Sequence, residues 1–235
     1  MTKSPSSKNN SHKEIVLEIR DVVKTYNSGN VIFNALDHVG LKIFKSGKVV
    51  DRGENELDRG QYNSQGQVFG VSGACAFYRL VALEDIKFNN EYFDEDFFAY
   101  KEDIDISYRL RWRGWKIYYC PQAISYHHRQ VFGGKVNIKD FILRRQKRSS
   151  LLKYYSYRNH LYLLIKNKSL INFFRDFFFI FFYELGKFFY ILFFEPKTLE
   201  AIRDVLNNYL KMFKKRRWIM KNKKIKSVDL RRWFN

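Results

Sequence analysis

The hydrophobic pattern of residues 103–113 predicts a helix. Ile104 and Tyr108 lie four positions apart and fall on one face of this helix. Ile106 and Leu110 have the same spacing and fall on another face. The helix therefore carries two apolar faces.

Both ends of this helix carry residues that suit a start and a stop. Gly114 fits the left-handed position that often follows the last helical turn. Glu102 and Asp103 fall in the first turn, where the helix dipole helps to keep carboxylates ionised. The neighbouring acidic residues act in the opposite direction and raise the pKa values of these two carboxylates. This setting suits a general base, although acidic residues at helix starts more often only cap the helix.

Short apolar runs on both sides of the helix predict strands. These runs are Val31–Leu36, Leu41–Phe44, Gln67–Val71, Ala74–Tyr78 and Trp115–Cys120. Gly47 and Gly53 predict turns, and Ser72–Gly73 predicts a tight corner. A glycine at such a corner lets the backbone approach a ligand closely, but a plain turn between strands explains it equally well.

Charge is distributed unevenly along the 235 residues, whose net charge is +19. Residues 1–128 contain equal numbers of basic and acidic side chains, so the whole excess lies in residues 129–235. The first residues are polar, show no signal peptide, and are expected to be disordered. The uneven charge predicts a neutral domain followed by a basic appendage.

The basic segment contains two kinds of predicted helix. Residues 138–168 are basic and include the aromatic run Tyr154–Ile165. Residues 170–194 are rich in phenylalanine, but charged residues divide them into runs shorter than the ~20 apolar residues of a membrane span. At ~100° per residue, Asp176, Glu184 and Lys187 fall within about 80° of one another and leave a broad aromatic face.

This aromatic face predicts a helix that lies in the plane of an anionic membrane surface. The flanking segments Lys211–Trp218 and Lys221–Lys226 supply basic residues, each worth about 1 kcal/mol close to an anionic leaflet. Alternatively, the aromatic face packs against the rest of the protein or another subunit. Nucleic-acid binding also uses basic and aromatic residues, but consecutive phenylalanines suit hydrocarbon better, and residues 1–128 are neutral.

The most specific signal is the motif Phe-Asp-Glu-x-Phe-Phe-x-Tyr-x-Glu-Asp-x-Asp at residues 93–105. Further segments fit one family in the same order: Leu36–Gly40, Asp51–Gly53, Val71–Ala74, Tyr108–Leu110, Gly114–Trp115, Pro121–His127 and Val228–Phe234. Together they resemble the family 2 glycosyltransferases, especially the bacterial rhamnosyltransferase-like branch.

This resemblance implies an α/β fold with three parts. Residues 1–30 form a polar N-terminal segment, residues 31–135 form the C-terminal part of a GT-A type domain, and residues 136–235 form a helical, basic, aromatic-rich extension. Relatives bind the nucleotide-sugar in a front half that this sequence begins too late to include. We therefore expect a truncated glycosyltransferase, or a subunit that needs a separate front-half polypeptide.

The reaction implied by the resemblance is inverting glycosyl transfer. An acceptor hydroxyl attacks the anomeric carbon of a nucleotide-sugar, and the nucleoside diphosphate leaves on the opposite face. By resemblance, Asp103 is the general base, and His127 is one ligand of a divalent Mg²⁺ or Mn²⁺ ion whose other ligands lie outside the chain. Ser72 and Gly73 are expected to contact substrate.

Three charged residues near Asp103 are further candidates for substrate binding. Glu102 and Asp105 are expected to orient the acceptor or the helix start. Arg109 either contacts substrate or pairs with Asp105 four positions earlier. The Asp-x-Asp triplets at 94–96 and 103–105 are alternative metal sites, but a role on the acceptor side fits the resemblance better.

These patterns predict an enzyme bound peripherally to the cytoplasmic face of the cell membrane. The resemblance implies that its substrates are a nucleotide-sugar and a saccharide or lipid-linked acceptor, and that its role lies in cell-surface polysaccharide synthesis. One competing prediction is a non-catalytic membrane-bound remnant or subunit. A basic nucleic-acid-binding protein is the less favoured alternative.

Overall fold

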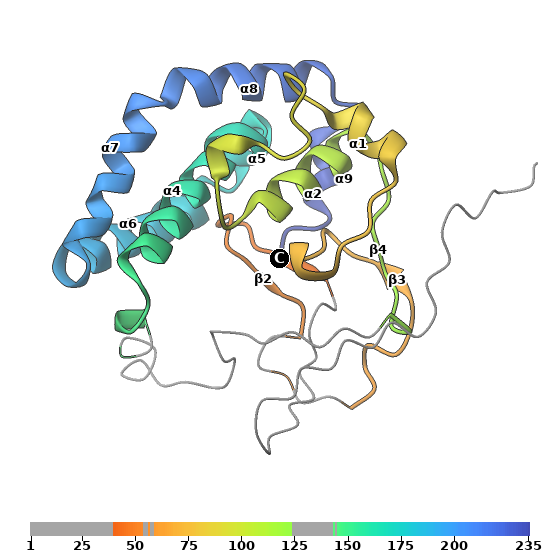
Figure 1. Ribbon diagram of the computed structural model, residues 1–235, viewed down its shortest axis with the longest axis horizontal. Coiled ribbons are helices and arrows are strands. Elements are labelled where there is room, and N and C mark those ends of the chain that lie inside the picture. The colour runs from red at the N-terminus through yellow and green to blue at the C-terminus, as the bar shows by residue number, and fades with distance from the viewer. Residues whose placement is uncertain (1–39, 54–55, 57–58, 124–142, 144) are drawn as a thin grey trace, which may run out of the picture.

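Short strands and helices form a mixed architecture in the computed structural model (Figure 1). The structure describes residues 40–53, 56, 59–123, 143 and 145–235. The predicted N-terminal segment 1–30, the predicted strand Val31–Leu36 and the candidate metal ligand His127 lie outside these residues. The described elements are compatible with the α/β class.

The first strand pair lies next to the C-terminus of the chain. β1 (Leu41–Ile43) pairs antiparallel with β2 (Val49–Asp51), as the apolar run at 41–44 predicts. The predicted turns are confirmed, since Gly47 and Gly53 have φ values of +83° and +84°. The backbone N–H of Asn235 donates to the carbonyl of Ile43 at 3.0 Å, so the last residue is tied to β1.

The second strand pair is shorter than its sequence pattern predicts. β3 (Gly66–Gln67) pairs antiparallel with β4 (Tyr118–Tyr119). The predicted strand Ala74–Tyr78 is wrong, because the chain forms the 3₁₀ helix η1 (Gly73–Cys75) and then enters α1 (Leu80–Ile86). The side chain of Ser72 accepts a hydrogen bond from the N–H of Ala74, which favours a turn over an extended strand.

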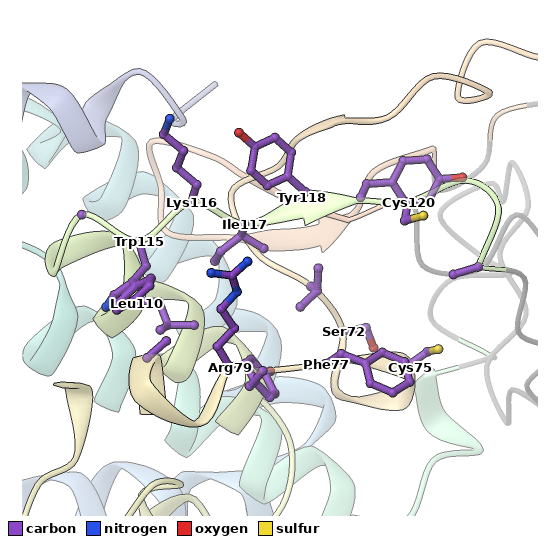
Figure 2. A pocket seen from close by; sticks show the side chains of 17 residues that line it. Ser72, Cys75, Phe77, Arg79, Leu110, Trp115, Lys116, Ile117, Tyr118 and Cys120 are labelled. Carbon is purple, nitrogen blue, oxygen red and sulfur yellow. The ribbon is translucent and has the colours of Figure 1, made fainter. Parts of the chain in front are cut away.

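The predicted acidic helix is present as α2 (Glu102–Trp112), and Gly114 follows it with a φ of +84°. Its two apolar faces pack into different clusters. Ile106 and Leu110 pack with residues of α1, beside a cavity between α1 and β4 that Figure 2 shows. Ile104 and Tyr108 pack into the main core. The two faces predicted from the sequence are therefore both buried, against different partners.

The second half of the chain is helical. Its elements are α4 (Ser150–Asn167), α5 (Leu170–Arg175), α6 (Phe177–Phe194), η3 (Pro196–Leu199), α7 (Glu200–Asn207), α8 (Tyr209–Lys221) and α9 (Ser227–Arg231). α7 and α8 run along the outside of α4 in Figure 1. The predicted helix within 138–168 is confirmed for α4, and the phenylalanine-rich segment is divided into two helices at Asp176.

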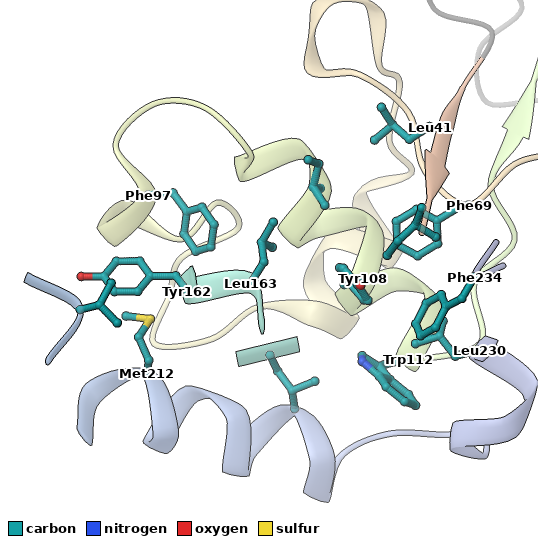
Figure 3. Packing of buried hydrophobic residues seen from close by; sticks show 14 residues of the cluster. Leu41, Phe69, Phe97, Tyr108, Trp112, Tyr162, Leu163, Met212, Leu230 and Phe234 are labelled. Atoms are coloured by element: carbon teal, nitrogen blue, oxygen red, sulfur yellow. The ribbon is translucent and has the colours of Figure 1, made fainter. Parts of the chain in front are cut away.

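The main core draws on both halves of the chain (Figure 3). Phe69 and Trp112 from the first half pack in one cluster with Tyr162, Met212 and Leu230 from the second. Burying each large apolar side chain stabilises the fold by roughly 1.5–3 kcal/mol. The predicted domain boundary at residues 135–136 lies outside the described residues, and the described residues on its two sides share this core.

Candidate active site

Asp103 lies in the first turn of α2, where it contacts the Ser72–Gly73 corner. The backbone N–H of Gly73 donates to Asp103 Oδ2 at 2.9 Å, and the N–H of Ile104 donates to Oδ1 at 2.7 Å. The hydroxyl of Ser107 donates to the backbone carbonyl of Asp103 at 2.8 Å, which anchors this turn. The fold thus brings together two predicted site segments that are far apart in the sequence.

The environment of Asp103 makes its carboxylate more basic than an ordinary aspartate. Burial raises its pKa, whereas the hydrogen bonds from Gly73 and Ile104 and the charge of Lys101 lower it in part. The carboxylate of Asp51 raises the pKa further. A carboxylate whose pKa is raised accepts a proton more readily, which is what a general base must do.

Two neighbouring side chains carry buried polar atoms that no described residue satisfies. Burial raises the pKa of Glu102, the charge of Asp103 adds to this effect, and Oε2 of Glu102 lacks a partner in the described part of the chain. The hydroxyl of Tyr78 is in the same situation. Burial raises the pKa of Tyr78, and the charges of Asp103 and Glu102 raise it as well, so the three groups lie within electrostatic range of one another. Buried unsatisfied polar atoms are candidates for contact with a ligand.

Sequence reasoning did not identify Tyr78. The protein has 16 tyrosines, and this one lies in a run that the pattern interprets as a strand. Its place beside Asp103 depends on the 3₁₀ turn at Gly73–Cys75, which redirects the chain before α1. No pattern in the sequence would have distinguished it.

The residues just before α2 have an unusual backbone conformation. Phe98, Tyr100 and Lys101 have φ values of 56°, 68° and 71°. Residues with a side chain rarely adopt positive φ, and such conformations gather at functional sites. We call residues 97–101 the acid loop, because they lead directly into Glu102 and Asp103.

Asp105 and Arg109 are also residues of α2, but their side chains contact other parts of the protein than the Ser72–Gly73 corner. Arg109 Nε donates to Asp105 Oδ2 at 2.8 Å, which is the pairing that the sequence left open as one alternative. Asn167 and Lys166 both contact the other oxygen of Asp105 at 2.7 Å. Burial alone would raise the pKa of Asp105, but Lys166 and Arg109 outweigh it and lower the pKa to about 2.

The other guanidinium nitrogens of Arg109 donate to the backbone carbonyls of Ile86 and Tyr92 at 2.9 and 2.6 Å. Both Asp105 and Arg109 are therefore buried and occupied by protein partners. A direct contact of either residue with substrate stays a prediction, and we do not use it below.

Lysines from the second half of the chain neutralise the acidic triplet at 94–96. Asp94 pairs with Lys166 and Lys215, and Asp96 pairs with Lys215 and Lys211. Ammonium groups occupy the oxygens that a metal ion would need. The two carboxylates of the 103–105 triplet also have separate surroundings, because Asp103 contacts the corner and Asp105 contacts Arg109.

Within the described residues, no group of three or more His, Cys, Asp or Glu side chains could hold a metal ion. His127 lies outside those residues. The described side chains alone therefore do not fit a divalent cation, and we derive no step through one.

A cavity of about 660 Å³ extends from the Ser72 corner toward β4 (Figure 2). Its lining includes Ser72 and Tyr78, the aromatic side chains of Trp115 and Tyr118, and the cationic side chain of Arg79. Aromatic walls with a few polar groups are typical of sites for organic ligands. Asp103 itself does not line the cavity, but Ser72 and Tyr78 do, and Ser72 directly precedes the Gly73 that donates to the Asp103 carboxylate.

Comparisons with known proteins support the same interpretation. Residues 12–193 match the family described as glycosyl transferase family group 2, a match that covers more than half of the chain. Comparisons with curated proteins and with solved structures gave no significant match. Membership implies a nucleotide-sugar donor and an acceptor, and the family generally uses a divalent metal. The rhamnosyl branch is a finer prediction that this match does not test. The chain, with Asp103 held against its glycine corner, belongs to glycosyltransferase family group 2.

Proposed function

We propose that the protein catalyses inverting glycosyl transfer with Asp103 as the general base. The acceptor hydroxyl gives its proton to Asp103 while its oxygen forms the new bond to the anomeric carbon of a nucleotide-sugar. The bond to the nucleoside diphosphate breaks on the opposite face, and the diphosphate leaves with the electron pair. The observation that carries this proposal is the half-buried carboxylate of Asp103, which two backbone N–H groups fix and which forms no ion pair with any of the described residues.

The geometry leaves Asp103 able to accept a proton. Each carboxylate oxygen has two lone pairs, and the structure uses one on each oxygen. The raised pKa favours proton uptake, and general-base assistance is worth roughly 10²–10⁴-fold in rate. We assign the buried Oε2 of Glu102 and the hydroxyl of Tyr78 to acceptor binding, because both atoms lack a partner in the described structure.

Gly73 supports a substrate-binding role for the corner. It is not among the glycines with positive φ, so its backbone does not require glycine. An added Cβ would lie 3.5 Å from Asp103 Cβ, an ordinary contact that the protein tolerates. The absence of a side chain at this position therefore keeps space beside the carboxylate for a substrate.

The neighbouring cavity supports a saccharide or lipid-linked acceptor. Sugar rings stack on aromatic side chains such as Trp115 and Tyr118, and Arg79 can bind an anionic group. On the donor side we keep the nucleotide-sugar, a GT-A type arrangement and His127 as a metal ligand. His127→Ala should then raise the Mn²⁺ concentration needed for half-maximal activity, whereas His128→Ala should not. The rhamnosyl donor and a separate front-half polypeptide stay predictions.

We also propose that α6 docks in the plane of an anionic membrane surface. Its charged residues point toward the protein: Glu184 bonds His160 Nε2 on α4 at 2.6 Å, and the buried Asp176 at its start pairs with Arg231 and with Lys168. The opposite side exposes phenylalanines, with Phe178 and Phe193 about 70 % exposed. The polarity of this helix is thus inverted relative to an ordinary surface helix.

Exposed apolar area of this kind marks an interaction site, and the +19 charge of the chain favours an anionic partner. By length and composition, α6 is also apolar enough to cross a membrane. Its ties to α4 and α9 favour docking along the surface instead, because crossing would break the ion pairs of Asp176 and Glu184. Such docking would keep the protein, and with it the proposed acceptor cavity, close to lipid-linked saccharides in the membrane.

The test of docking is sedimentation with vesicles of phosphatidylcholine, with and without phosphatidylglycerol. The wild-type chain should bind the anionic vesicles more tightly, and Phe178→Ser/Phe182→Ser should weaken binding at least tenfold. The matched control is Leu206→Ser/Leu210→Ser, which alters two apolar residues on α7 and α8 that are at least about as exposed. Equal binding by the wild-type chain and the α6 variant would contradict the proposal.

The test of catalysis is release of nucleoside diphosphate from a set of nucleotide-sugars, with Mn²⁺ and a saccharide or lipid-linked acceptor. Asp103→Asn should lower the rate roughly 10²–10⁴-fold. The matched control, Asp229→Asn, alters an exposed aspartate in α9 and should leave the rate unchanged. Equal, measurable rates for the wild-type chain and Asp103→Asn would overturn the assignment of Asp103 as the general base. No release by the wild-type chain would favour a non-catalytic membrane-bound protein.

A further inference from the structure

A buried asparagine on α4 holds the acid loop. The side chain of Asn159 is fully buried, and its Nδ2 donates to the backbone carbonyls of Phe97, Ala99 and Tyr100 at 2.8, 2.7 and 2.7 Å. An amide nitrogen carries only two hydrogens, so at least one of them is shared between two of the three carbonyls, which the loop brings together around this one atom. The proposed chemistry makes no use of Asn159, although it lies in the aromatic run that the sequence singled out.

Arg158 fixes the orientation of this amide. Its Nε donates to Oδ1 of Asn159 at 3.1 Å, which leaves the amide nitrogen directed at the loop. A second nitrogen of Arg158 donates to the carbonyl of Asp96. The guanidinium also lies over the rings of Tyr155 and Tyr162, at 4.6 and 5.2 Å. Two consecutive residues of α4 thus bind the loop from Asp96 to Tyr100.

The loop needs such support because its conformation is strained. Phe98, Tyr100 and Lys101 all have positive φ, which side chains disfavour. Phe97 is buried against Tyr162 of α4, with ring centroids 6.1 Å apart, so one end of the loop is also fixed by packing (Figure 3). The other end is Lys101, the residue directly before Glu102. The path of the loop therefore determines where α2 begins.

We propose that Asn159 is a positioning residue, whose amide holds the acid loop in its left-handed path and so sets the place of Asp103 against Gly73. The importance of this position for catalysis rests on the proposed function, whereas the structural role of the amide does not. Asn159 acts through the loop and does not contact the reacting atoms.

The sharpest variant is Asn159→Asp, which keeps the shape of the side chain but replaces the donor nitrogen with an acceptor oxygen facing three carbonyls. Asn159→Ala removes the amide. Arg158→Lys is a milder variant. Lysine keeps the positive charge, but its single nitrogen cannot reproduce the guanidinium that donates to Asn159 Oδ1 and to the carbonyl of Asp96 from two nitrogens. At least one of these variants should fold well enough to measure.

The matched control is Asn172→Asp. Asn172 is also fully buried, and its Nδ2 donates to the carbonyl of Ser227 at 2.8 Å, which ties α5 to α9 away from the acid loop. Amide hydrogen exchange should accelerate in residues 97–104 for the Asn159 variants and around Asn172 and Ser227 for the control. The kcat per folded molecule should fall about 10²-fold for Asn159→Ala, with a smaller change in KM, and should stay unchanged for the control.

A second-site rescue separates positioning from general stability. Glycine adopts positive φ without a steric penalty, so Tyr100→Gly should relax the strain that Asn159 otherwise holds. The double variant Asn159→Ala/Tyr100→Gly should recover part of the lost kcat. A purely stabilising asparagine would show no such recovery in kcat per folded molecule.

Unchanged exchange at 97–104 in the Asn159 variants would overturn the structural role, and faster exchange with unchanged kcat would overturn the positioning role. If the wild-type chain transfers no sugar, the proposed function fails separately. Titration of the Asp103 carboxyl by NMR then decides the inference. Loss of the Gly73 contact should shift the pKa of Asp103 in Asn159→Ala, and identical titrations would overturn the proposal.

Discussion

Asp103 and Asp105 stand two positions apart on the same helix, yet they have opposite surroundings. Asp103 is half-buried, accepts backbone hydrogen bonds from Gly73 and Ile104 at its carboxylate, and has a raised pKa. Asp105 is fully buried, is paired with Arg109 and Lys166, and has a pKa lowered to about 2. The comparison teaches that position in an acidic motif does not assign a role. What packs on each face of the helix assigns it.

The largest expected difference concerns stability. Asp105→Asn should lower the free energy of unfolding by about 3 kcal/mol, because it leaves Arg109 buried without its carboxylate. This loss is at the low end of the range for breaking a buried ion pair, because Lys166 still forms an ion pair with Asp94. Asp103→Asn should leave stability unchanged or slightly higher at pH 7, because its raised pKa shows that the folded state disfavours its charge. Urea denaturation measures both.

A fall in stability for Asp103→Asn as large as that for Asp105→Asn would break the comparison. It would mean that Asp103 has a structural role that its contacts do not show. A catalytic role for Asp103 would then need evidence beyond the loss of activity in this variant.

The second difference concerns acid. Asp105 has a folded pKa of about 2 against an ordinary value of 3.8, so it stabilises the fold above pH 3.8. This contribution, on the order of 2 kcal/mol, is lost as the pH falls through that range toward 2. Between pH 5 and pH 2, the free energy of unfolding should therefore fall more steeply for the wild-type chain than for Asp105→Asn. Urea denaturation at a series of pH values measures this.

Asp103 should show the opposite sign, because its folded pKa is raised. Its charge destabilises the fold as the pH rises through the raised pKa, and its protonation below that pKa should switch off catalysis. The acidic limb of the kcat/KM profile should accordingly lie above the ordinary aspartate value. A limb at or below 3.8 would contradict the assignment of the general base.

The smallest expected effect is at the glycine that touches Asp103. Gly73→Ala should leave the unfolding free energy nearly unchanged, since the new Cβ meets Asp103 Cβ at an ordinary 3.5 Å. It should raise the KM for the acceptor about tenfold, equivalent to ~1.4 kcal/mol, because the methyl group takes space beside the carboxylate. A matched control is Gly186→Ala on α6, where an added Cβ meets no atom within 4 Å.

A stability loss for Gly73→Ala with no change in KM would show that the glycine only forms a turn. That outcome would favour the interpretation of Ser72–Gly73 as a plain turn over its interpretation as a site of close approach to a ligand. It would leave the assignment of Asp103 intact, because the backbone N–H of Gly73 remains in place.

The second half of the chain shows what a charge count does not reveal. Its excess of basic residues predicts an appendage, a division that stays a prediction, and the structure adds that Lys166, Lys215 and Arg158 are buried and support the acidic motif and its loop. Composition counts a buried lysine and an exposed one alike. The pairing of these cations with distant carboxylates and carbonyls appears only when the helices are packed.

The sequence by itself determined the local elements and the family. The spacing of Ile104, Tyr108, Ile106 and Leu110 placed α2, because apolar periodicity is a local property. The motif at 93–105 identified a glycosyltransferase, which the family match confirms. The phenylalanine-rich segment indicated an aromatic face, and α6 exposes one.

Only the tertiary structure decided which carboxylate accepts backbone hydrogen bonds and which forms buried ion pairs. It brought Gly73 to Asp103, Tyr78 to the same site and Asn159 to the acid loop, each across a stretch of chain whose path no local pattern fixes. It also turned the charged side of α6 inward. The physical reason is that burial and long-range partners set the pKa, the strain and the exposure of a side chain. Burial and such partners arise only when distant segments pack together.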